Sequence, residues 1–196
     1  MKMCKRMICL VLLVVMAFAL VACSKEKKPM RVEVEIEVAD YGVIRVKLDR
    51  EKAPITVDNF LKLVEEDFYD GLTFHRVVEG FMIQGGDPNG DGTGHSEERI
   101  KGEFAENGYD NPISHTRGTI SMARSEDPDS ASCQFFIMHE NGFSLDGKYA
   151  AFGTVVSGME VVDAICSDIK PRHTNSVGVI LDDARKPVIT EIRIVE

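Results

Sequence analysis

Residues 31–38 alternate without a break between apolar and charged side chains, reading Arg-Val-Glu-Val-Glu-Ile-Glu-Val. A period of two residues is that of a β-strand with one face buried and the other in water. After a turn at 40–42 the alternation resumes in residues 44–48, where aliphatic residues are separated by Arg45 and Lys47. The two segments are therefore predicted to pair as a hairpin with acidic side chains opposite basic ones.

The rest of the chain is predicted to contain two helices and six short strands. One helix begins at Pro54, where the missing N–H of proline costs nothing, and carries an apolar stripe as far as Val64. A second, shorter helix is predicted over 158–165, followed by a polar loop at 167–186. The strands are short apolar runs bounded by loops: 72–78, 81–83, 119–123, 134–138, 150–156 and 188–194. Many strands with two helices indicate an antiparallel barrel capped by helices.

The first 22 residues are predicted to be a secretory signal rather than part of the fold. A basic start precedes 17 consecutive apolar residues, a run shorter than the ~20 residues that span a bilayer comfortably. The run ends in Leu-Val-Ala-Cys, which resembles the lipobox of bacterial lipoproteins and makes Cys23 the expected lipidation site. We therefore expect a signal peptide at 1–22, a lipidated, flexible linker at 23–31 and one domain at 32–196, held on the extracytoplasmic face of the cell membrane. A tight membrane span and an ordinary signal peptide are the alternatives.

The net charge limits the classes of partner that the domain can bind. The chain has a net charge of −9, and the predicted signal holds three basic residues and no acidic one, so the remainder carries −12. An acidic domain argues against a nucleic-acid partner and would be repelled by anionic lipids of the membrane. The acyl chains on Cys23 must therefore hold the protein at the membrane.

The spacing of Cys133 and Cys166 does not demand a disulfide, and two separate thiols are expected. The five histidines lack the spacing of a zinc site, and no metal is expected.

Four motifs follow one another in the predicted domain. The first reads Phe-His-Arg-Val-Val-Glu-Gly-Phe-Met-Ile-Gln-Gly-Gly-Asp at 74–87. The others are Ser-Met-Ala-Arg at 121–124, Cys-Gln-Phe-Phe-Ile at 133–137 and Leu-Asp-Gly-Lys-Tyr-Ala-Ala-Phe-Gly at 145–153. Together they closely resemble the cyclophilins, the barrel-shaped peptidyl-prolyl cis-trans isomerases, over nearly the whole predicted domain. The resemblance implies a closed antiparallel eight-stranded β-barrel capped by two α-helices, and an isomerase without a cofactor.

The resemblance also implies a role for individual residues. It makes Arg76 the catalytic residue. It implies an apolar floor, a rim and polar contacts for the substrate, formed by Phe81, Met82, Gln84, Ala123, Arg124, Gln134, Phe136, Leu145 and Tyr149. Two positions depart from the family pattern. Ser144 replaces a tryptophan, which predicts weakened inhibition by cyclosporin, and Tyr149 replaces a histidine that often follows Asp-Gly-Lys.

Isomerisation of the peptide bond before proline suits these residue types. Rotation crosses a barrier of ~18–20 kcal/mol without breaking a bond, so it requires no nucleophile, metal or general base. An apolar pocket for the ring and a fixed cation that favours the twisted amide would lower the barrier. Arginine suits the second role because it stays charged when partly buried. We expect a monomeric isomerase that acts on proline-containing segments of unfolded or partly folded exported proteins at the membrane surface.

Two other classes of function stay open. A chaperone or scaffold could grip proline-containing segments with incidental isomerase activity, but binding alone needs the apolar floor and not the cation of Arg76. A calcium-dependent structural lipoprotein would depend on residues 87–98, which match the EF-hand loop pattern in full. The pattern follows a strand-like run instead of a helix and contains Pro88 and Gly94, so a surface turn is the favoured interpretation. No nucleophile motif of a protease is recognisable.

Overall fold

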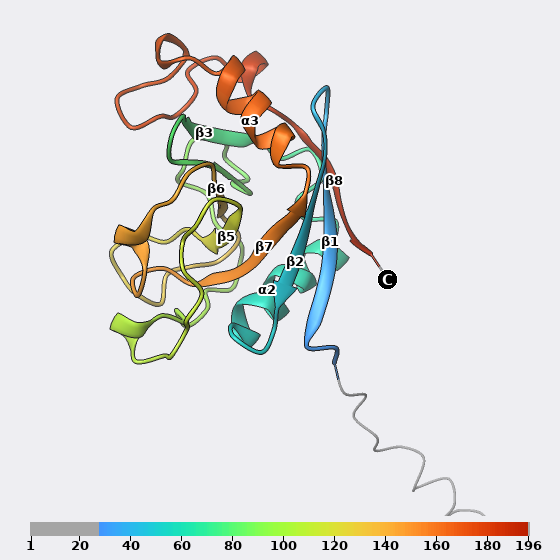
Figure 1. Cartoon of the computed structure of the whole chain (residues 1–196). Coiled ribbons are helices and arrows are strands. Elements are labelled where there is room, and N and C mark those ends of the chain that lie inside the picture. Colours follow the sequence, from blue (N-terminus) through green and yellow to red (C-terminus); the bar gives the residue numbers. More distant parts are fainter. Residues whose placement is uncertain (1–27, 196) are drawn as a thin grey trace, which may run out of the picture.

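The computed structural model describes residues 28–195. The predicted signal peptide, the lipidation site at Cys23 and most of the predicted linker therefore lie outside the described residues. These residues form eight strands and two helices, and Figure 1 draws the chain in sequence colours. The strands are β1 (Arg31–Val38), β2 (Gly42–Asp49), β3 (Phe74–Val78), β4 (Met82–Gly85), β5 (Thr119–Met122), β6 (Phe135–Met138), β7 (Ala151–Ser157) and β8 (Ile189–Val195). The helices are α2 (Pro54–Glu65) and α3 (Met159–Asp168).

All eight strands form one antiparallel sheet in the order β3-β4-β6-β5-β7-β2-β1-β8. The sheet curls into a half-barrel (Figure 1). The mainly β fold with eight antiparallel strands is thus confirmed, but closure of the barrel is not. In the described part of the chain, an isolated bridge joins Thr73 and Val188, the residues that directly precede the end strands β3 and β8. Beyond that point a different segment lies along β3, since Ile180 N donates to His75 O at 2.9 Å.

The predicted hairpin forms as β1 and β2. Its register places Glu35 opposite Arg45 and Glu33 opposite Lys47, and Arg45 forms an ion pair with Glu35. The alternate residues point inward and are buried, as the period of two predicts. Arg193 on β8 adds a second ion pair to Glu35 at 2.5 Å, so charge complementarity continues onto the neighbouring strand.

Helix α2 begins at Pro54, as predicted, but its first turn is capped by a residue that lies far away in the sequence. The preceding residue, Ala53, offers no capping side chain. Instead the buried carboxylate of Glu103 accepts hydrogen bonds from Ile55 N at 3.0 Å, Thr56 N at 2.8 Å and Thr56 Oγ1 at 2.7 Å. A carboxylate stabilises a helix N-terminus because it satisfies free N–H groups and complements the helix dipole.

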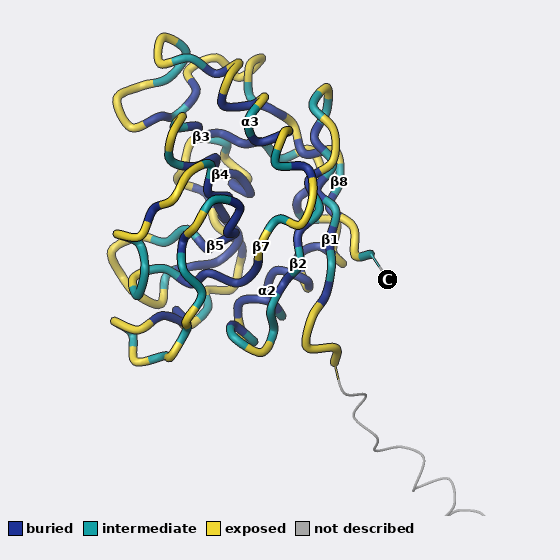
Figure 2. Tube along the Cα trace, in the orientation of Figure 1, coloured by how far each residue is buried: buried dark blue, intermediate teal, exposed yellow. Residues whose placement is uncertain are grey.

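The main core fills the inside of the curled sheet, where buried segments of the strands and helices meet in Figure 2. Phe60 of α2 lies at its centre, with ring centroids 5.1 Å from Tyr69, 5.6 Å from Phe135 and 5.3 Å from Phe152. Cys133 and Cys166 are buried free thiols, as predicted. Within residues 28–195, none of the helices has the length and apolarity needed to cross a bilayer.

Element boundaries differ from the predicted ones by one to three residues, most clearly at the end of α3. This helix continues to Asp168 because Ile165 and Cys166 are still buried against the core. The predicted loop that follows contains two short 3-10 helices, Pro171–His173 and Asp183–Arg185.

Candidate active site

The register of three neighbouring strands brings the predicted site residues into one row. Arg76 pairs with Gln84 in the β3–β4 ladder, and Gln84 pairs with Phe136 in the β4–β6 ladder. Residues directly opposite in an antiparallel sheet point to the same face. The next residue along each strand points the other way and belongs to the main core: Val77, Ile83 and Ile137. The site therefore lies on the outer face of the sheet, with the core behind it.

A groove with two adjoining cavities lies over this row. The larger has a volume of about 310 Å³ and is lined by nine of the ten predicted residues: Arg76, Phe81, Met82, Gln84, Ala123, Arg124, Phe136, Leu145 and Tyr149. The tenth, Gln134, lines a neighbouring cavity of about 200 Å³, which shares Gln84, Ala123 and Arg124 with the first. The structure thus brings together all ten residues, whose individual roles stay predictions.

The floor of the larger cavity is apolar and separate from the main core. Met82, Phe136 and Met138 are buried and form a cluster of their own. The ring of Tyr149 meets that of Phe136 edge-on, with centroids 5.9 Å apart. Such a recess favours an uncharged ring or aliphatic group, because burial against it removes apolar surface from water.

Arg76 lines the same cavity as this floor and is held at two of its nitrogens. Its Nε donates to the carbonyl oxygen of Val177 at 2.7 Å, and its Nη1 donates to Gln84 Oε1 at 3.0 Å. Burial lowers the pKa of Arg76 from its usual value, but a guanidinium stays protonated at neutral pH. Nη2 makes no hydrogen bond to any residue between 28 and 195 and is left to face a ligand.

Gln84 and Gln134 form a hydrogen-bond chain that runs in one direction. Gln134 Nε2 donates to the carbonyl oxygens of Gly94 at 2.8 Å and Gly92 at 3.2 Å, which turns Gln134 Oε1 toward Gln84. Gln84 Nε2 donates to that oxygen at 2.9 Å, which leaves Gln84 Oε1 to accept from Arg76. Because carbonyls can only accept and a guanidinium can only donate, both amide orientations are fixed by the ends of the chain.

Arg124 forms the wall between the two cavities. Its guanidinium lies 5.0 Å from the ring centroid of Phe104 and 4.8 Å from that of Tyr149, and its Nε donates to Lys148 O at 3.0 Å. These contacts attach Tyr149 and the loop after Leu145 to the groove. Ser144 stands in a short 3-10 helix, Phe143–Leu145, on the rim.

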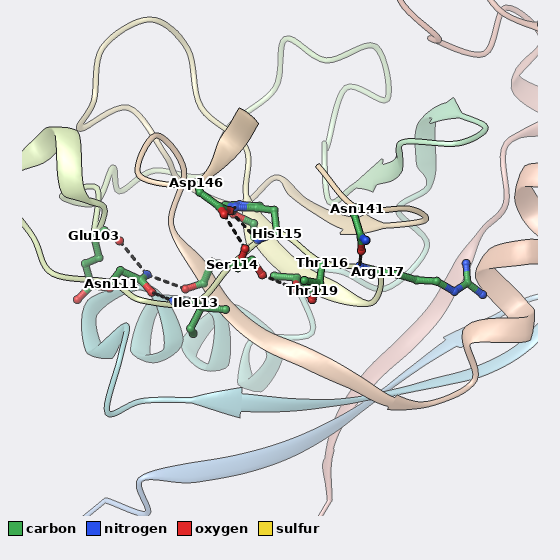
Figure 3. Close-up of polar contacts among 12 residues, drawn as sticks. Glu103, Asn111, Ile113, Ser114, His115, Thr116, Arg117, Thr119, Asn141 and Asp146 are labelled. Carbon is green, nitrogen blue, oxygen red and sulfur yellow. Dashed lines mark hydrogen bonds and ion pairs between the residues drawn. The ribbon is translucent and has the colours of Figure 1, made fainter. Parts of the chain in front are cut away.

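His115 supports the floor by packing against Phe136, a role that the sequence did not suggest. Its ring stacks on Phe136 at 5.9 Å between centroids. Its Nδ1 lies 2.8 Å from Asp146 Oδ1 and its Nε2 lies 3.0 Å from Ser121 Oγ. Figure 3 shows Asp146 turned toward both Ser114 and His115. Burial lowers the pKa of His115, although the Asp146 carboxylate opposes the shift. The stacked ring, hydrogen-bonded at both nitrogens, holds Phe136 in place.

The loop 87–98, which matches the EF-hand pattern, folds around the carboxylate of its first residue, Asp87. Asp87 is buried and accepts hydrogen bonds from Asn89 N at 2.9 Å and Asp91 N at 3.0 Å, and also from Gly92 N. Glu98, the last residue of the pattern, is turned to Lys62 at 3.1 Å. The loop therefore uses Asp87 as a turn-forming residue, as the surface-turn interpretation requires.

The sequence and the fold are similar to those of known isomerases. The sequence model of the family "Cyclophilin type peptidyl-prolyl cis-trans isomerase/CLD" matches residues 33–195. Peptidyl-prolyl cis-trans isomerase B of Bacillus subtilis is 48% identical over 121 residues, covering 62% of this chain and 81% of the relative. Peptidyl-prolyl cis-trans isomerase B of Escherichia coli is 41% identical over 160 residues, covering 78% and 93%.

A solved structure gives the same result. A cyclophilin-type isomerase of Cryptosporidium parvum, crystallised in the presence of the dipeptide Ala-Pro, superposes with a TM-score of 0.72 at 28% identity, covering 84% of this chain and 99% of that one. The family match, the relatives and the shared fold agree, and the chain belongs to the cyclophilin-type peptidyl-prolyl cis-trans isomerases.

Proposed function

We propose that the groove catalyses rotation about X-Pro bonds with Arg76 as the catalytic residue and the Phe136 floor as the proline pocket. The observation that carries this assignment is the placement of a fixed guanidinium beside an apolar recess, on the three neighbouring strands β3, β4 and β6. A relative was crystallised in the presence of Ala-Pro, a dipeptide that ends in proline. This supports a proline-containing ligand for the same groove.

The apolar recess and Arg76 act on different parts of the substrate. The recess holds the proline ring, so that rotation moves the residue before proline and not the ring. As the C–N bond twists, conjugation is lost and the proline nitrogen gains a lone pair that can accept a hydrogen bond. A donor from Arg76 binds that form better than the planar amide, which lowers the barrier. We assign this contact to Nη2, which makes no hydrogen bond to the described residues, whereas Nε and one of the two N–H groups of Nη1 are engaged.

An assay with a short X-Pro peptide tests this function. The full chain, purified in detergent, is expected to accelerate isomerisation. A matched peptide with alanine in place of proline is expected not to compete, because it lacks the ring that fills the recess. Tight binding of the X-Pro peptide without acceleration would favour the chaperone or scaffold alternative.

We also propose that the enzyme works on exported proteins while tethered to the membrane by a lipid on Cys23. The support is the basic start, the apolar run and the Leu-Val-Ala-Cys sequence. Cys23→Ala is expected to abolish incorporation of labelled palmitate. Cys9→Ala, which removes another thiol of the same apolar run, is the matched control and is expected to retain it. Equal incorporation in wild type and Cys23→Ala would contradict the tether.

A further inference from the structure

The turn 175–179 lies along the free edge of β3, the strand that carries Arg76. Val77 N donates to Gly178 O at 2.9 Å, and Ile180 N donates to His75 O at 2.9 Å. Arg76 itself is bridged to Val179 in an antiparallel manner. Since β4 occupies the other edge of β3, this turn supplies the second set of backbone partners around Arg76.

The turn is stiffened by its own hydrogen bonds. Asn175 Oδ1 accepts from Val177 N at 3.1 Å and from Val179 N at 3.0 Å. The backbone of Asn175 also donates to Val179 O at 2.9 Å and accepts from Gly178 N at 3.0 Å. One exposed asparagine thus fixes the direction of the carbonyl groups between it and Val179.

Gly178 allows the turn to approach β3 closely. It has a φ of +91°, and an added Cβ would lie 2.5 Å from Val78 Cγ2 and 3.0 Å from Val77 O. Any side chain at this position has to move the turn away from the strand. The close approach is what brings Val177 O to 2.7 Å from Arg76 Nε.

We propose that the turn 175–179 is a positioning element for Arg76, in which the Val177 carbonyl sets the plane of the guanidinium. A single hydrogen bond, donated to Gln84, would leave the planar guanidinium free to rotate about that bond. A second bond, at Nε and from the opposite side, removes the rotation and directs Nη2 into the groove. The inference depends on the proposed catalytic role of Arg76.

Variants of the turn, tested in the full chain, separate this role from simple covering of the β3 edge. Asn175→Ala and Gly178→Ala are each expected to lower kcat about tenfold, the effect of losing one hydrogen bond to a charged group, with little change in KM. Asn175→Asp keeps a side-chain acceptor for both amides and is expected to restore activity. Gly108→Ala is the matched control, because Gly108 has a φ of +76° with no atom near its would-be Cβ. It is expected to stay within about twofold of wild type.

The same substitutions in an Arg76→Ala background give the decisive comparison. Gly178→Ala is expected to cause no further loss there, because the group it positions is gone. Equal losses in both backgrounds would overturn the inference and assign the turn a role in the fold alone. If Arg76→Ala retains full activity, the proposed role of Arg76 fails instead, so the two failures are distinguishable.

A measurement on the wild-type protein does not depend on folding of the variants. The Arg76 Nε proton is expected to give a resolved NMR signal that exchanges slowly with water, because it is bonded to Val177 O. A signal that exchanges as fast as that of free arginine would overturn the inference.

Discussion

Replacement of Gln84 tests whether the position of Arg76, its charge, or both support catalysis. Gln84→Met keeps the length of the side chain but removes the acceptor for Arg76 Nη1 at 3.0 Å and the donor to Gln134 Oε1 at 2.9 Å. A hydrogen bond to a charged group contributes about 1.5–3 kcal/mol, and the half-exposed site places this one near the lower end. We expect kcat/KM for an X-Pro peptide to fall about tenfold to thirtyfold.

Gln84→Glu separates the two contributions. Glutamate retains the acceptor for Arg76, so a purely positional role predicts near-normal activity. Its carboxylate, however, partly neutralises the guanidinium and faces Gln134 Oε1 without a proton to donate. Gln134 cannot turn its amide, because its Nε2 is held by the carbonyls of Gly92 and Gly94. We therefore expect Gln84→Glu to be at least as impaired as Gln84→Met in a coupled isomerisation assay. Wild-type activity in the folded Gln84→Met enzyme would refute the reasoning about the chain.

Three further results are expected. Phe136→Ala should weaken both turnover and peptide affinity, because it opens the recess itself, and should lower the free energy of unfolding by about 3 kcal/mol; an unchanged peptide Kd by calorimetry would contradict this. Burial lowers the pKa of His75, so below the usual histidine pKa of ~6.5 the unfolded chain takes up a proton that the folded chain does not. The free energy of unfolding should therefore fall between about pH 7 and pH 5.5, and urea titration should show a smaller fall in His75→Leu; equal falls would point to other groups. Calcium should not bind residues 87–98 more tightly than ~1 mM, since Asp87 is engaged by backbone N–H groups; a micromolar Kd by calorimetry would contradict this.

Local patterns were sufficient to predict most of the strands and helices, whereas the site residues were implied by the resemblance to the cyclophilins. The period of two in β1 and β2 reflects burial of one face of the sheet, and it can be recognised from residues that are adjacent in the sequence. The motif from Phe74 to Asp87 spans both β3 and β4, so the pairing of Arg76 with Gln84 follows from one short hairpin. Patterns of this kind involve residues close together in the sequence, so a single sequence is enough to detect them.

The features that the sequence did not reveal depend on contacts between distant segments. Glu103 caps a helix 47 to 48 residues earlier in the chain, and no periodicity marks a residue that acts so far away. His115 is an isolated histidine in the sequence, and only the fold stacks its ring on Phe136. The resemblance implied a closed barrel, but the edge of β3 is occupied by the turn at Asn175.

Arg76→Ala is the most direct test of the account. If the guanidinium binds the twisted amide better than the planar one, its removal should slow turnover more than it weakens peptide binding. We expect a loss of about 3–4 kcal/mol of transition-state stabilisation, or about a hundredfold to a thousandfold in kcat/KM. Arg76→Lys should recover little, because an ammonium group cannot reproduce two fixed bonds and a free planar donor. With folding confirmed by circular dichroism, an Arg76→Ala enzyme within about threefold of wild-type kcat/KM would contradict the central claim.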